Sequence, residues 1–463
     1  MKKTTRTISG ITPVAVMSQP LGCPGRCIYC PTFSSTPQSY TPESPAVLRA
    51  RSVEYDALQQ VQSRLKTLTE MGHPLDKIEL IVMGGTFLAA SADYQYQFIK
   101  ECFDGLNGRV SATLEEAKLI NETAAHRCTG LCIETRPDFC GQAEIDRMLL
   151  FGTTRVELGV QMLCDDIYRT IKRGHSVEDV VIATRLLRNA GLKVHYHWMP
   201  GLPGSIPEGD LRLSSLLFED PRFRPDGLKI YPTMVVEGTE LEKWYLEGRF
   251  RPYDKNVMID LIADIKSLVP KYVRISRVLR DIPSKFIVGG LKVSMRDPLR
   301  KRMGQLGLQC HCIRCREYGF RVRDGWNIGQ PQMTRLDYEA AGGLEVFLSF
   351  EDEGETLFGM LRLRIQDQPL PALKGDVGLN VALIRELHIF GPELALTQHH
   401  ENAAQHKGLG RALLTEAERI ARDQFQRNWI AILSGVGARE YYRAEGYELQ
   451  GAYMVKNISA SRS

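Results

Sequence analysis

The sequence has no apolar run that could cross a membrane. Nothing in its 463 residues approaches the roughly 18 consecutive apolar side chains that a bilayer requires. The N-terminus is basic, but residues 7–20 are mixed in polarity and lack the apolar core of a signal peptide. Low-complexity segments and short internal repeats are also missing. We therefore expect no membrane association and a cytoplasmic location.

A disulfide framework is not indicated either. The chain has eleven cysteines, an odd number, and six of them fall in two tight clusters. Secreted disulfide frameworks are usually shorter and more evenly spaced. In a reducing compartment, such clusters are typical of metal or iron–sulfur sites. The other five cysteines lie in or beside apolar segments and are expected to be core residues: Cys102, Cys128, Cys132, Cys140 and Cys164.

Net charge is only +4, but it is unevenly distributed. Between Lys271 and Arg323 there are fourteen Lys or Arg against three Asp or Glu, so the rest of the chain is net negative. A local basic block suggests a polyanion partner such as nucleic acid. An ordinary solvated surface is the alternative. The candidates for backbone phosphate contacts are Arg274, Arg277, Arg280, Arg300, Lys301 and Arg302.

The length predicts more than one domain, and an α/β fold class follows from the order of segments. Short β-rich runs alternate with helical segments as far as Val278, which is typical of parallel strands with right-handed crossovers. The predicted strands are 14–17, 78–83, 131–134, 155–161, 193–198, 227–231 and 273–278. The predicted helices are 46–70, 94–106, 114–126, 142–151, 177–189, 208–218 and 254–268. Together they predict a partial (β/α) barrel whose chemistry lies at the C-terminal ends of the strands.

The strand–helix rhythm breaks near Lys292. Residues 292–330 are basic, hold three cysteines and lack an apolar period, so we predict a linker with its own metal. Alternating strands from Gly343, followed by a helix at 408–425, predict a separate α+β domain. We therefore expect a barrel over 1–291, a basic metal-binding linker over 292–330 and an α+β domain over 331–463.

Three cysteines near the N-terminus have the spacing CxxxCxxC: Cys23, Cys27 and Cys30. Three thiolates on one loop can hold three irons of a 4Fe–4S cluster and leave the fourth open to a non-protein ligand. This spacing is the signature of radical S-adenosylmethionine (SAM) enzymes, in which the open iron chelates SAM. The alternatives are a zinc site that lacks one ligand and purely structural cysteines.

Later segments agree with a site at the barrel mouth. Gly84 and Gly85 end the second strand and allow a close backbone approach, as in the segment that receives the SAM amino group in this superfamily; a plain turn is the alternative. Glu134 closes the third strand. His195 and His197 lie on the fifth, and the sequence does not say which of them points inward.

The second cluster, Cys310, Cys312 and Cys315, suits a structural zinc ion with a fourth ligand from elsewhere. His311 lies between two of these cysteines and is not counted as a ligand. A second iron–sulfur cluster and free thiols are the alternatives.

A QxxGxG motif opens the helix of the C-terminal domain. It is the pyrophosphate loop of the GNAT acetyltransferases, in which backbone N–H groups and the helix N-terminus bind the diphosphate. A strand precedes it, and Tyr441 and Tyr442 follow, where a tyrosine commonly reaches the CoA sulfur. We expect acetyl-CoA binding; a degenerate structural domain is the alternative. The motif residues are Gln405, Gly408, Leu409, Gly410 and Arg411.

These motifs occur in one distinctive order. The segments CxxxCxxCP, MGGTF, IETRPD, RVELGVQ, CxCxxCRE, IRELHIFG, QHKGLG and SGVGAREYYR closely resemble the catalytic subunit of Elongator, over essentially the whole chain. The resemblance implies an enzyme that uses SAM and acetyl-CoA to convert the wobble uridine in the tRNA anticodon loop to 5-carboxymethyluridine.

The resemblance also implies site residues. Cys23, Cys27 and Cys30 match the cluster ligands. The positions that match the family's acetyl-CoA site are Lys77, Glu386, Leu387, His388, Ile389, Leu409, Gly410, Arg411 and Tyr442. No accessory Elongator-like subunit is implied, and a homodimer is compatible with the sequence.

A single chemical role unites the two halves. Uridine C5 is a poor nucleophile, so a deoxyadenosyl radical would activate the acetyl methyl group, and hydrolysis of the thioester would release CoA. We therefore expect the barrel mouth and the acetyl-CoA site to share one cleft at the domain boundary. The alternative is a protein (histone) N-acetyltransferase with a structural radical SAM domain, in which Glu386 is available as general base. A non-enzymatic tRNA-binding scaffold is a third reading.

Overall fold

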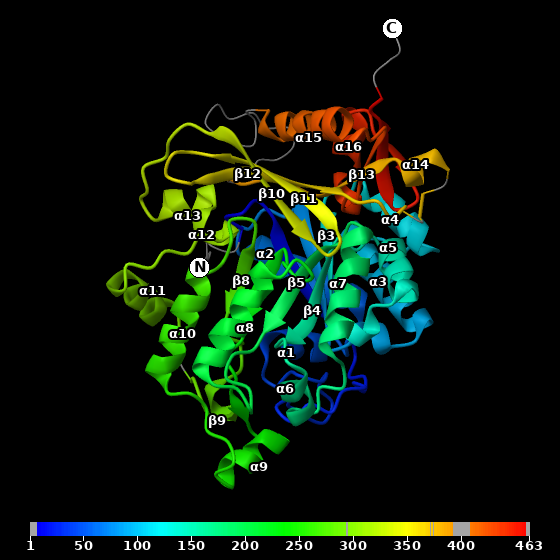
Figure 1. The fold of residues 1–463 in the computed structure, drawn as a ribbon. Coiled ribbons are helices and arrows are strands. Elements are labelled where there is room, and N and C mark those ends of the chain that lie inside the picture. The colour runs from blue at the N-terminus through cyan, green and yellow to red at the C-terminus, as the bar shows by residue number, and fades with distance from the viewer. Residues whose placement is uncertain (1–6, 293–294, 371, 374, 392–407, 460–463) are drawn as a thin grey trace.

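Two seven-stranded sheets organise the chain, and both are visible in the ribbon of the computed structural model (Figure 1). The structure describes residues 7–292, 295–370, 372–373, 375–391 and 408–459. No helix among these residues is long and apolar enough to cross a membrane.

The first sheet is entirely parallel and forms a partial barrel, as predicted. Along its second strand, buried Ile78, Leu80 and Val82 alternate with half-buried residues. This period-two pattern gives the sheet one apolar face. In spatial order the strands are β1 (Thr12–Met17), β2 (Lys77–Met83), β3 (Arg127–Thr135), β4 (Arg155–Gln161), β5 (Lys193–Trp198), β6 (Gly227–Ile230) and β8 (Arg274–Val278).

Helices connect the strands. They are α1 (Pro45–Arg51), α2 (Ala57–Glu70), α3 (Ala92–Asn107), α4 (Leu114–Asn121), α5 (Gln142–Phe151), α6 (Asp165–Thr170), α7 (Val177–Asn189), α8 (Pro207–Glu219), α9 (Glu240–Leu246) and α10 (Lys255–Ser267). A small two-stranded sheet, β7 (Val235–Val236) with β9 (Ile287–Gly289), lies outside the barrel sheet.

Two helix predictions are wrong in extent. The segment 46–70 is two helices, because Glu54 and Tyr55 adopt left-handed φ values of 52° and 61° and Asp56 caps a new helix. The helix from Leu114 ends at Asn121, whose side chain accepts a hydrogen bond from Cys128 N at 2.7 Å and so turns the chain into β3.

The linker is more regular than predicted. It contains α11 (Arg296–Gln305), α12 (Ile313–Arg316) and α13 (Tyr318–Arg323). The first of these is polar, and Arg302 pairs with Asp260 of α10 at 2.6 and 3.0 Å. A polar helix held by such contacts has no apolar period for sequence analysis to detect.

The second sheet belongs to the α+β domain. Its strands, in spatial order, are β10 (Gln332–Ala340), β11 (Gly343–Glu351), β12 (Leu357–Ile365), β13 (Val381–Ile389), β14 (Trp429–Ile432), β16 (Tyr453–Asn457) and β15 (Glu448–Gln450). The helices are α14 (Asp376–Leu379), α15 (Leu409–Phe425) and α16 (Arg439–Ala444). Strands β13 and β14 pair only from Val381 to Ile384, so β13 continues beyond its parallel partner. Strands β10, β15 and β16 were not predicted.

The α+β domain packs against the N-terminal ends of the barrel strands. The barrel residues in these contacts precede or begin a strand. His388 contacts Ser9 O at 3.0 Å, Glu386 contacts Lys193 at 3.3 Å, and Arg362 contacts Tyr272 O at 2.7 Å. The two domains therefore meet at the end of the barrel opposite the cysteine loop, which follows β1 (Figure 1).

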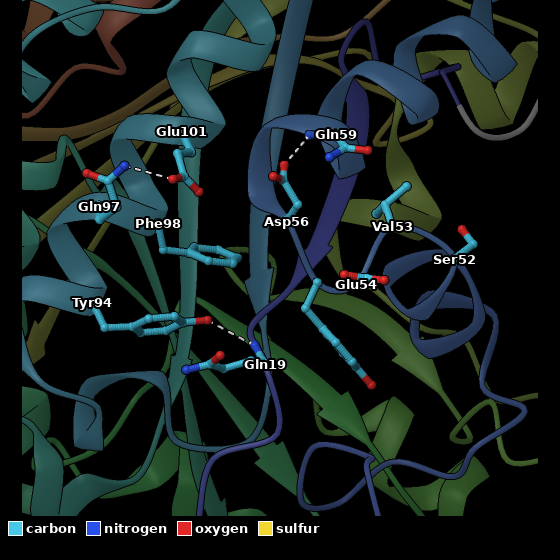
Figure 2. A pocket seen from close by; sticks show the side chains of 11 residues that line it. Gln19, Ser52, Val53, Glu54, Asp56, Gln59, Tyr94, Gln97, Phe98 and Glu101 are labelled. Atoms are coloured by element: carbon cyan, nitrogen blue, oxygen red, sulfur yellow. Dashed lines mark hydrogen bonds between the residues drawn. The ribbon is translucent and has the colours of Figure 1, made fainter.

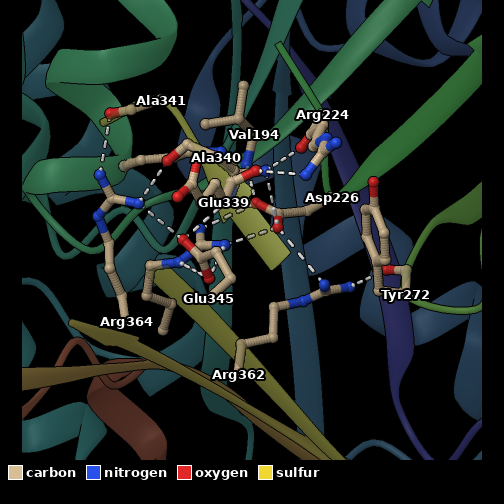
Figure 3. A network of polar contacts seen from close by, with 12 residues as sticks. Val194, Arg224, Asp226, Tyr272, Glu339, Ala340, Ala341, Glu345, Arg362 and Arg364 are labelled. Carbon is tan, nitrogen blue, oxygen red and sulfur yellow. Dashed lines mark hydrogen bonds and ion pairs between the residues drawn. The ribbon is translucent and has the colours of Figure 1, made fainter. Parts of the chain in front are cut away.

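A buried network of charges crosses this domain boundary (Figure 3). Asp226, just before β6, accepts hydrogen bonds from Arg385 at 2.6 and 2.9 Å and from Val194 N at 2.9 Å. Glu345 of β11 is bonded to Arg188, Arg364 and Arg385. Each of these charged side chains is at most 1% exposed. Buried charges require such pairing, so the network fixes how the two domains fit together.

Candidate functional site

The predicted cysteine triad opens into a cavity of about 450 Å³ at the C-terminal ends of the barrel strands. The loop that carries Cys23, Cys27 and Cys30 forms part of its wall. Residues at or just after the strand ends contribute much of the rest, including Thr86, Glu134, Gln161, Met199 and Tyr231, and helices α1 and α2 complete it. Its position is the one that parallel barrels use for chemistry.

Polar and cationic groups surround the three thiols. Arg173 donates to Cys27 Sγ at 3.3 Å, and Gln38 Nε2 donates to Cys30 Sγ at 3.5 Å. Burial and the neighbouring Cys27 raise the pKa of the Cys30 thiol to about 11. The Cys30 thiol therefore needs a metal or another cation to ionise fully at neutral pH.

One buried donor in this wall has no partner among the described residues: Arg136 Nη1, although Arg136 binds Asp138 through its other nitrogens at 2.8 and 2.9 Å. A side chain at Gly25, within the cysteine loop, would collide with this nitrogen. Three thiols next to a buried guanidinium with one free N–H group fit an anionic iron–sulfur cluster and a carboxylate ligand on its open iron.

The two glycines at the end of β2 have different positions. Gly85 lines the cavity with φ of 82°, and a side chain there would press on Gln38 O at 3.1 Å. Gly84 has φ of 139° and packs against Ser18, with no room for a side chain. Both positions need glycine because β2 approaches the start of the cysteine loop so closely.

The inner wall of the cavity is an ionic cluster. Glu134 accepts from Tyr40 at 2.8 Å and lies 3.5 Å from Lys229, which also pairs with Glu157. His197 Nε2 lies 3.1 Å from Glu157 Oε2. Ligand atoms of Glu134, Glu157 and His197 lie within 4.8 Å of one another, as in a metal site, but Lys229 already supplies the cation.

The structure shows where both histidines of β5 point. His195 and His197 lie two residues apart, so they share one face of the strand. His197 lines the cavity, whereas His195 is 4% exposed and packs against Gly227 deeper in the barrel. His197 is therefore the histidine of the cavity.

The second cysteine cluster is compact. The Sγ atoms of Cys310, Cys312 and Cys315 lie within 4.8 Å of one another. His311 instead pairs with Glu355 at 2.8 Å, so it does not point into the cluster. Within the described ranges, no other His, Asp or Glu joins the three sulfurs; the nearby charge is Lys266, 3.9 Å from Cys315.

Glu386 of β13 lies at the domain boundary with both carboxylate oxygens occupied. Lys193 is 3.3 Å from one oxygen and Arg362 is 2.8 Å from the other. Burial alone would raise the pKa of the Glu386 carboxyl, but Lys193 and Arg362 outweigh it and hold that pKa below its usual range. His388 stacks on Phe390 with 4.3 Å between ring centroids, and Leu387 and Ile389 pack against the domain core.

The predicted phosphate loop is described from Gly408 onward; Gln405 lies outside the described residues. Gly408 caps α15 with φ of 69°, and Leu409 is buried. The Tyr441 hydroxyl would lie 3.1 Å from a side chain at Gly410. Arg411 is 70% exposed and pairs with Glu445 at 2.8 Å, within reach of the helix N-terminus.

Tyr442 points into the α+β domain rather than to its surface. It is 6% exposed and contacts Tyr441 and Tyr447 edge to face. Burial, Tyr441 and Glu386 together raise the pKa of its phenol above the usual value. The phenol is therefore protonated at neutral pH and lies close enough to Glu386 for an electrostatic interaction.

The predicted cofactor residues fall at two ends of the barrel. Lys77 begins β2, next to Arg127 in the register, whereas Gly85 and the cysteines lie at the other end. A seven-residue strand spans roughly 20 Å. The expectation of one cleft at the domain boundary is therefore wrong: the cysteine cavity and the α+β domain lie at opposite ends of the sheet, with the barrel interior between them.

The six basic residues predicted to contact RNA phosphates differ in how free they are to do so. Arg274 pairs with buried Glu317, Arg302 with Asp260, and Arg280 with Ser39 at the cavity wall. Arg277 also lines the cavity and is 47% exposed. Arg300 is 82% exposed and Lys301 is exposed beside it on α11, so these two project into solvent.

A second hollow, about 530 Å³, lies between the α1–α2 connection and α3 (Figure 2). Asp56 and Glu101 are bonded there to Gln59 and Gln97, and Tyr94 accepts from Gln19 N. Its lining contains no cysteine, histidine or predicted site residue.

Comparison with family models defines the class of protein. Residues 18–209 match the Radical SAM superfamily, and residues 225–304 match the Radical_SAM C-terminal domain. The partial barrel with its cysteine cavity is therefore a radical SAM domain, and this match implies a 4Fe–4S cluster and SAM.

Full-length relatives then identify the family. The chain is 65% identical to the tRNA uridine(34) acetyltransferase of Dehalococcoides mccartyi, over 99% of this chain and 100% of the relative. It is 41% identical to Elongator complex protein 3 of Homo sapiens, over 98% of this chain and 86% of the relative. The solved structure of Methanocaldococcus infernus Elp3 with residues 1–46 deleted matches with a TM-score of 0.86 and 46% identity, over 97% of this chain and 100% of that chain. The chain belongs to the Elongator complex protein 3 family.

The predicted resemblance and fold class, a partial radical SAM barrel followed by an α+β GNAT domain with a metal-binding linker, are thereby confirmed. Sequence reasoning missed Arg173, Gln38 and Tyr40, which contact the cysteines or Glu134. Of these three residues, only Arg173 could have been suspected from the sequence, because it belongs to the segment that follows the strand RVELGVQ.

Proposed function

We propose that this protein modifies the wobble uridine of tRNA, forming 5-carboxymethyluridine from acetyl-CoA and SAM. The single observation that carries the proposal is the cavity in which Cys23, Cys27 and Cys30 meet a buried arginine with one free nitrogen, Arg136 Nη1, in a chain that also carries the GNAT phosphate loop. The names of the relatives, tRNA uridine(34) acetyltransferase among them, support tRNA as the substrate and the cytoplasm as the location.

The cavity residues have distinct roles in this proposal. The three cysteines would hold a 4Fe–4S cluster, which supplies reductive cleavage of SAM when both are bound. Arg136 and Arg173 would balance negative charge at the cluster, and Gly85 would let the backbone approach SAM. Residues of β13, the N-terminus of α15 and Tyr442 would bind acetyl-CoA, with Lys77 at the facing end of the barrel.

The structure disfavours the N-acetyltransferase alternative. A general base for a lysine amine needs a free carboxylate that can accept a proton. Glu386, the candidate base, accepts from Lys193 at one oxygen and from Arg362 at the other, and these two cations stabilise its charged form. No second observation favours that reaction.

The decisive experiment incubates the reduced, reconstituted protein with tRNA, SAM and acetyl-CoA labelled in its methyl group. Nucleoside mass spectrometry should find label in 5-carboxymethyluridine at position 34, dependent on both cofactors. Label in protein lysines, with none in tRNA, would support the acetyltransferase alternative instead.

Tyr442→Phe should slow tRNA-dependent release of CoA by about 10²-fold or more, because in this proposal the protonated phenol would give its hydrogen to the departing thiolate. Release of free CoA, with and without tRNA and without SAM, measures the effect. Tyr447→Phe is the control, since its hydroxyl binds Glu418 at 2.7 Å. Equal rates for Tyr442→Phe and the parent protein would exclude a role for the phenol.

We further propose a structural zinc ion at Cys310, Cys312 and Cys315. The purified protein should contain about one zinc per chain, and Cys312→Ser should lose it, because a hydroxyl is a poor zinc ligand. Metal analysis of both proteins measures this. A Cys27→Ser variant should show the converse, with zinc kept and iron lost; iron in place of zinc at the linker would contradict the assignment.

Arg300→Ala combined with Lys301→Ala should weaken tRNA binding. Each lost phosphate contact should reduce the slope of log K against log salt by roughly 0.7 to 0.9. Binding measured over a salt series tests this, with Arg419→Ala on α15, 46% exposed, as the control. An unchanged slope would show that α11 does not contact RNA.

A further inference from the structure

The cavity contains a carboxylate–histidine pair with one free nitrogen. His197 Nε2 lies 3.1 Å from Glu157 Oε2, and a carboxylate only accepts, so this nitrogen carries the hydrogen. The side chain of His197 is 16% exposed, and that of Glu157 is 1% exposed. The other ring nitrogen, Nδ1, has no hydrogen-bond partner in the described part of the chain and is left as a proton acceptor.

Glu157 is held in its charged form from two sides. Lys229 of β6 pairs with the oxygen that His197 contacts, and Arg155 lies 3.5 Å from the other. Burial alone would raise the pKa of the Glu157 carboxyl, but Lys229, His197 and Arg155 hold it well below the usual range. Such a carboxylate orients the imidazole and fixes which ring nitrogen carries the hydrogen.

Most other ionisable groups of the cavity are poor proton acceptors, and Asp281, a carboxylate at its exposed edge, is paired with Arg277 at 2.9 Å. Lys229 has a raised pKa, because Glu157, Tyr231 and Glu134 outweigh its burial. Burial raises the pKa of the Tyr40 and Tyr231 phenols, so both stay protonated. Glu134 already accepts from Tyr40 and lies beside Lys229. His197 is the only imidazole among the described residues that line the cavity.

We propose that His197 is the catalytic residue that removes the C5 proton of uridine, with Glu157 as its positioning residue. This inference rests on the proposed function. When the acetyl-derived carbon radical bonds to C5, an unpaired electron is left at C6. The C5–H bond then breaks and its hydrogen passes as a proton to His197 Nδ1; an oxidised iron–sulfur cluster, which Cys23, Cys27 and Cys30 would hold, would accept the one electron that must leave. The remaining electrons restore the C5–C6 double bond.

The groups around His197 fit this task. Glu157 faces it from β4, Lys229 from β6, Tyr231 from just after β6, and Glu134 from β3. The Tyr231 ring contacts the imidazole edge to face, with 5.3 Å between centroids, and so limits its rotation. A proton accepted at Nδ1 leaves the Nε2–H bond to Glu157 intact.

His197→Gln should lower 5-carboxymethyluridine formation by about 10²-fold or more, while cleavage of SAM and release of CoA continue. Glu157→Gln should lower it as well, and Glu157→Asp, which keeps the carboxylate, should recover part of the rate. His126→Gln, a half-buried histidine bonded to Leu75 O outside the cavity, is the matched control. Thermal melting of each variant checks folding.

A second readout needs no cofactor. Nitrogen-15 NMR of histidine-labelled protein reports which ring nitrogen of His197 carries the hydrogen. The Nε2–H form should dominate in the parent protein, because Nε2 donates to Glu157, and should lose that preference in Glu157→Gln. An unchanged distribution of the two forms would overturn the positioning role.

The outcomes separate the two proposals. Wild-type product with an unaffected His197→Gln would overturn the proton transfer alone. Parallel loss of SAM cleavage in His197→Gln would overturn it too, and would make His197 a SAM-binding residue. A wild-type protein that forms no carboxymethyluridine under complete conditions would overturn the proposed function, and this inference with it.

Discussion

Cys27→Ser is expected to abolish the iron–sulfur absorbance and all cleavage of SAM. Cys27 is the middle cysteine of the triad, and its sulfur accepts the hydrogen bond from buried Arg173 at 3.3 Å. A serine hydroxyl is a poor ligand for cluster iron, and two thiolates do not hold a 4Fe–4S cluster firmly. Anaerobic reconstitution, followed by the visible spectrum, iron content and formation of 5′-deoxyadenosine, measures the loss.

Cys164→Ser is the control for this change. Cys164 is half-buried at the N-cap of α6, outside the cavity, and serine is a good residue at such a cap. It should keep its cluster and its activity, and Cys27→Ser should melt near the temperature of the parent protein. Retained SAM cleavage in reconstituted Cys27→Ser would refute the cluster assignment.

Asp226→Asn should reduce the free energy of unfolding by about 3–5 kcal/mol, the range seen when one partner of a buried ion pair is removed. Asp226 is fully buried and neutralises Arg385 and Arg188. Burial alone would raise the pKa of its carboxyl, but Arg188, Arg385 and Arg362 hold it well below the usual range, so the residue is charged in the folded protein. Asparagine would leave Arg188 and Arg385 to share the charge of Glu345, which also pairs with Arg364, so the buried network would carry an uncompensated positive charge.

Urea unfolding measures this effect. The matched control is Asp337→Asn, which removes the carboxylate of a surface pair with Arg335; its loss should cost less than about 1 kcal/mol. Similar unfolding midpoints for the two variants would contradict the view that the charge network holds the domains together.

Much of this architecture could be predicted because it depends on local patterns. The seven barrel strands are short runs of buried residues between helical segments, and the cysteine and glycine motifs occur at their ends. The helix break at Glu54 and Tyr55 could not be predicted, because residues other than glycine rarely adopt a left-handed φ and give no signal when they do.

Pairings between distant residues were also beyond the sequence. The basic block is evident as a count of charges, but the count does not show that Glu317 neutralises Arg274 or that Asp260 holds Arg302. The same holds for the Glu157–His197 pair, whose members lie on neighbouring strands. Which end of the barrel the second domain covers depends on such long-range contacts, so the expected shared cleft was misplaced.

The position of the α+β domain and the cysteine cavity at opposite ends of the barrel has a kinetic consequence under the proposed function. The thioester is bound at one end of the barrel and the radical is generated at the other, so one reactant must travel before the two can meet. The tRNA anticodon loop is bulky, whereas the acetyl group is attached to the long, flexible arm of CoA. The acetyl group is therefore the reactant that we expect to move. Each turnover would then include movement of the acetyl group through the barrel. If the barrel interior were obstructed, SAM cleavage and thioester hydrolysis would both continue, but no 5-carboxymethyluridine would form.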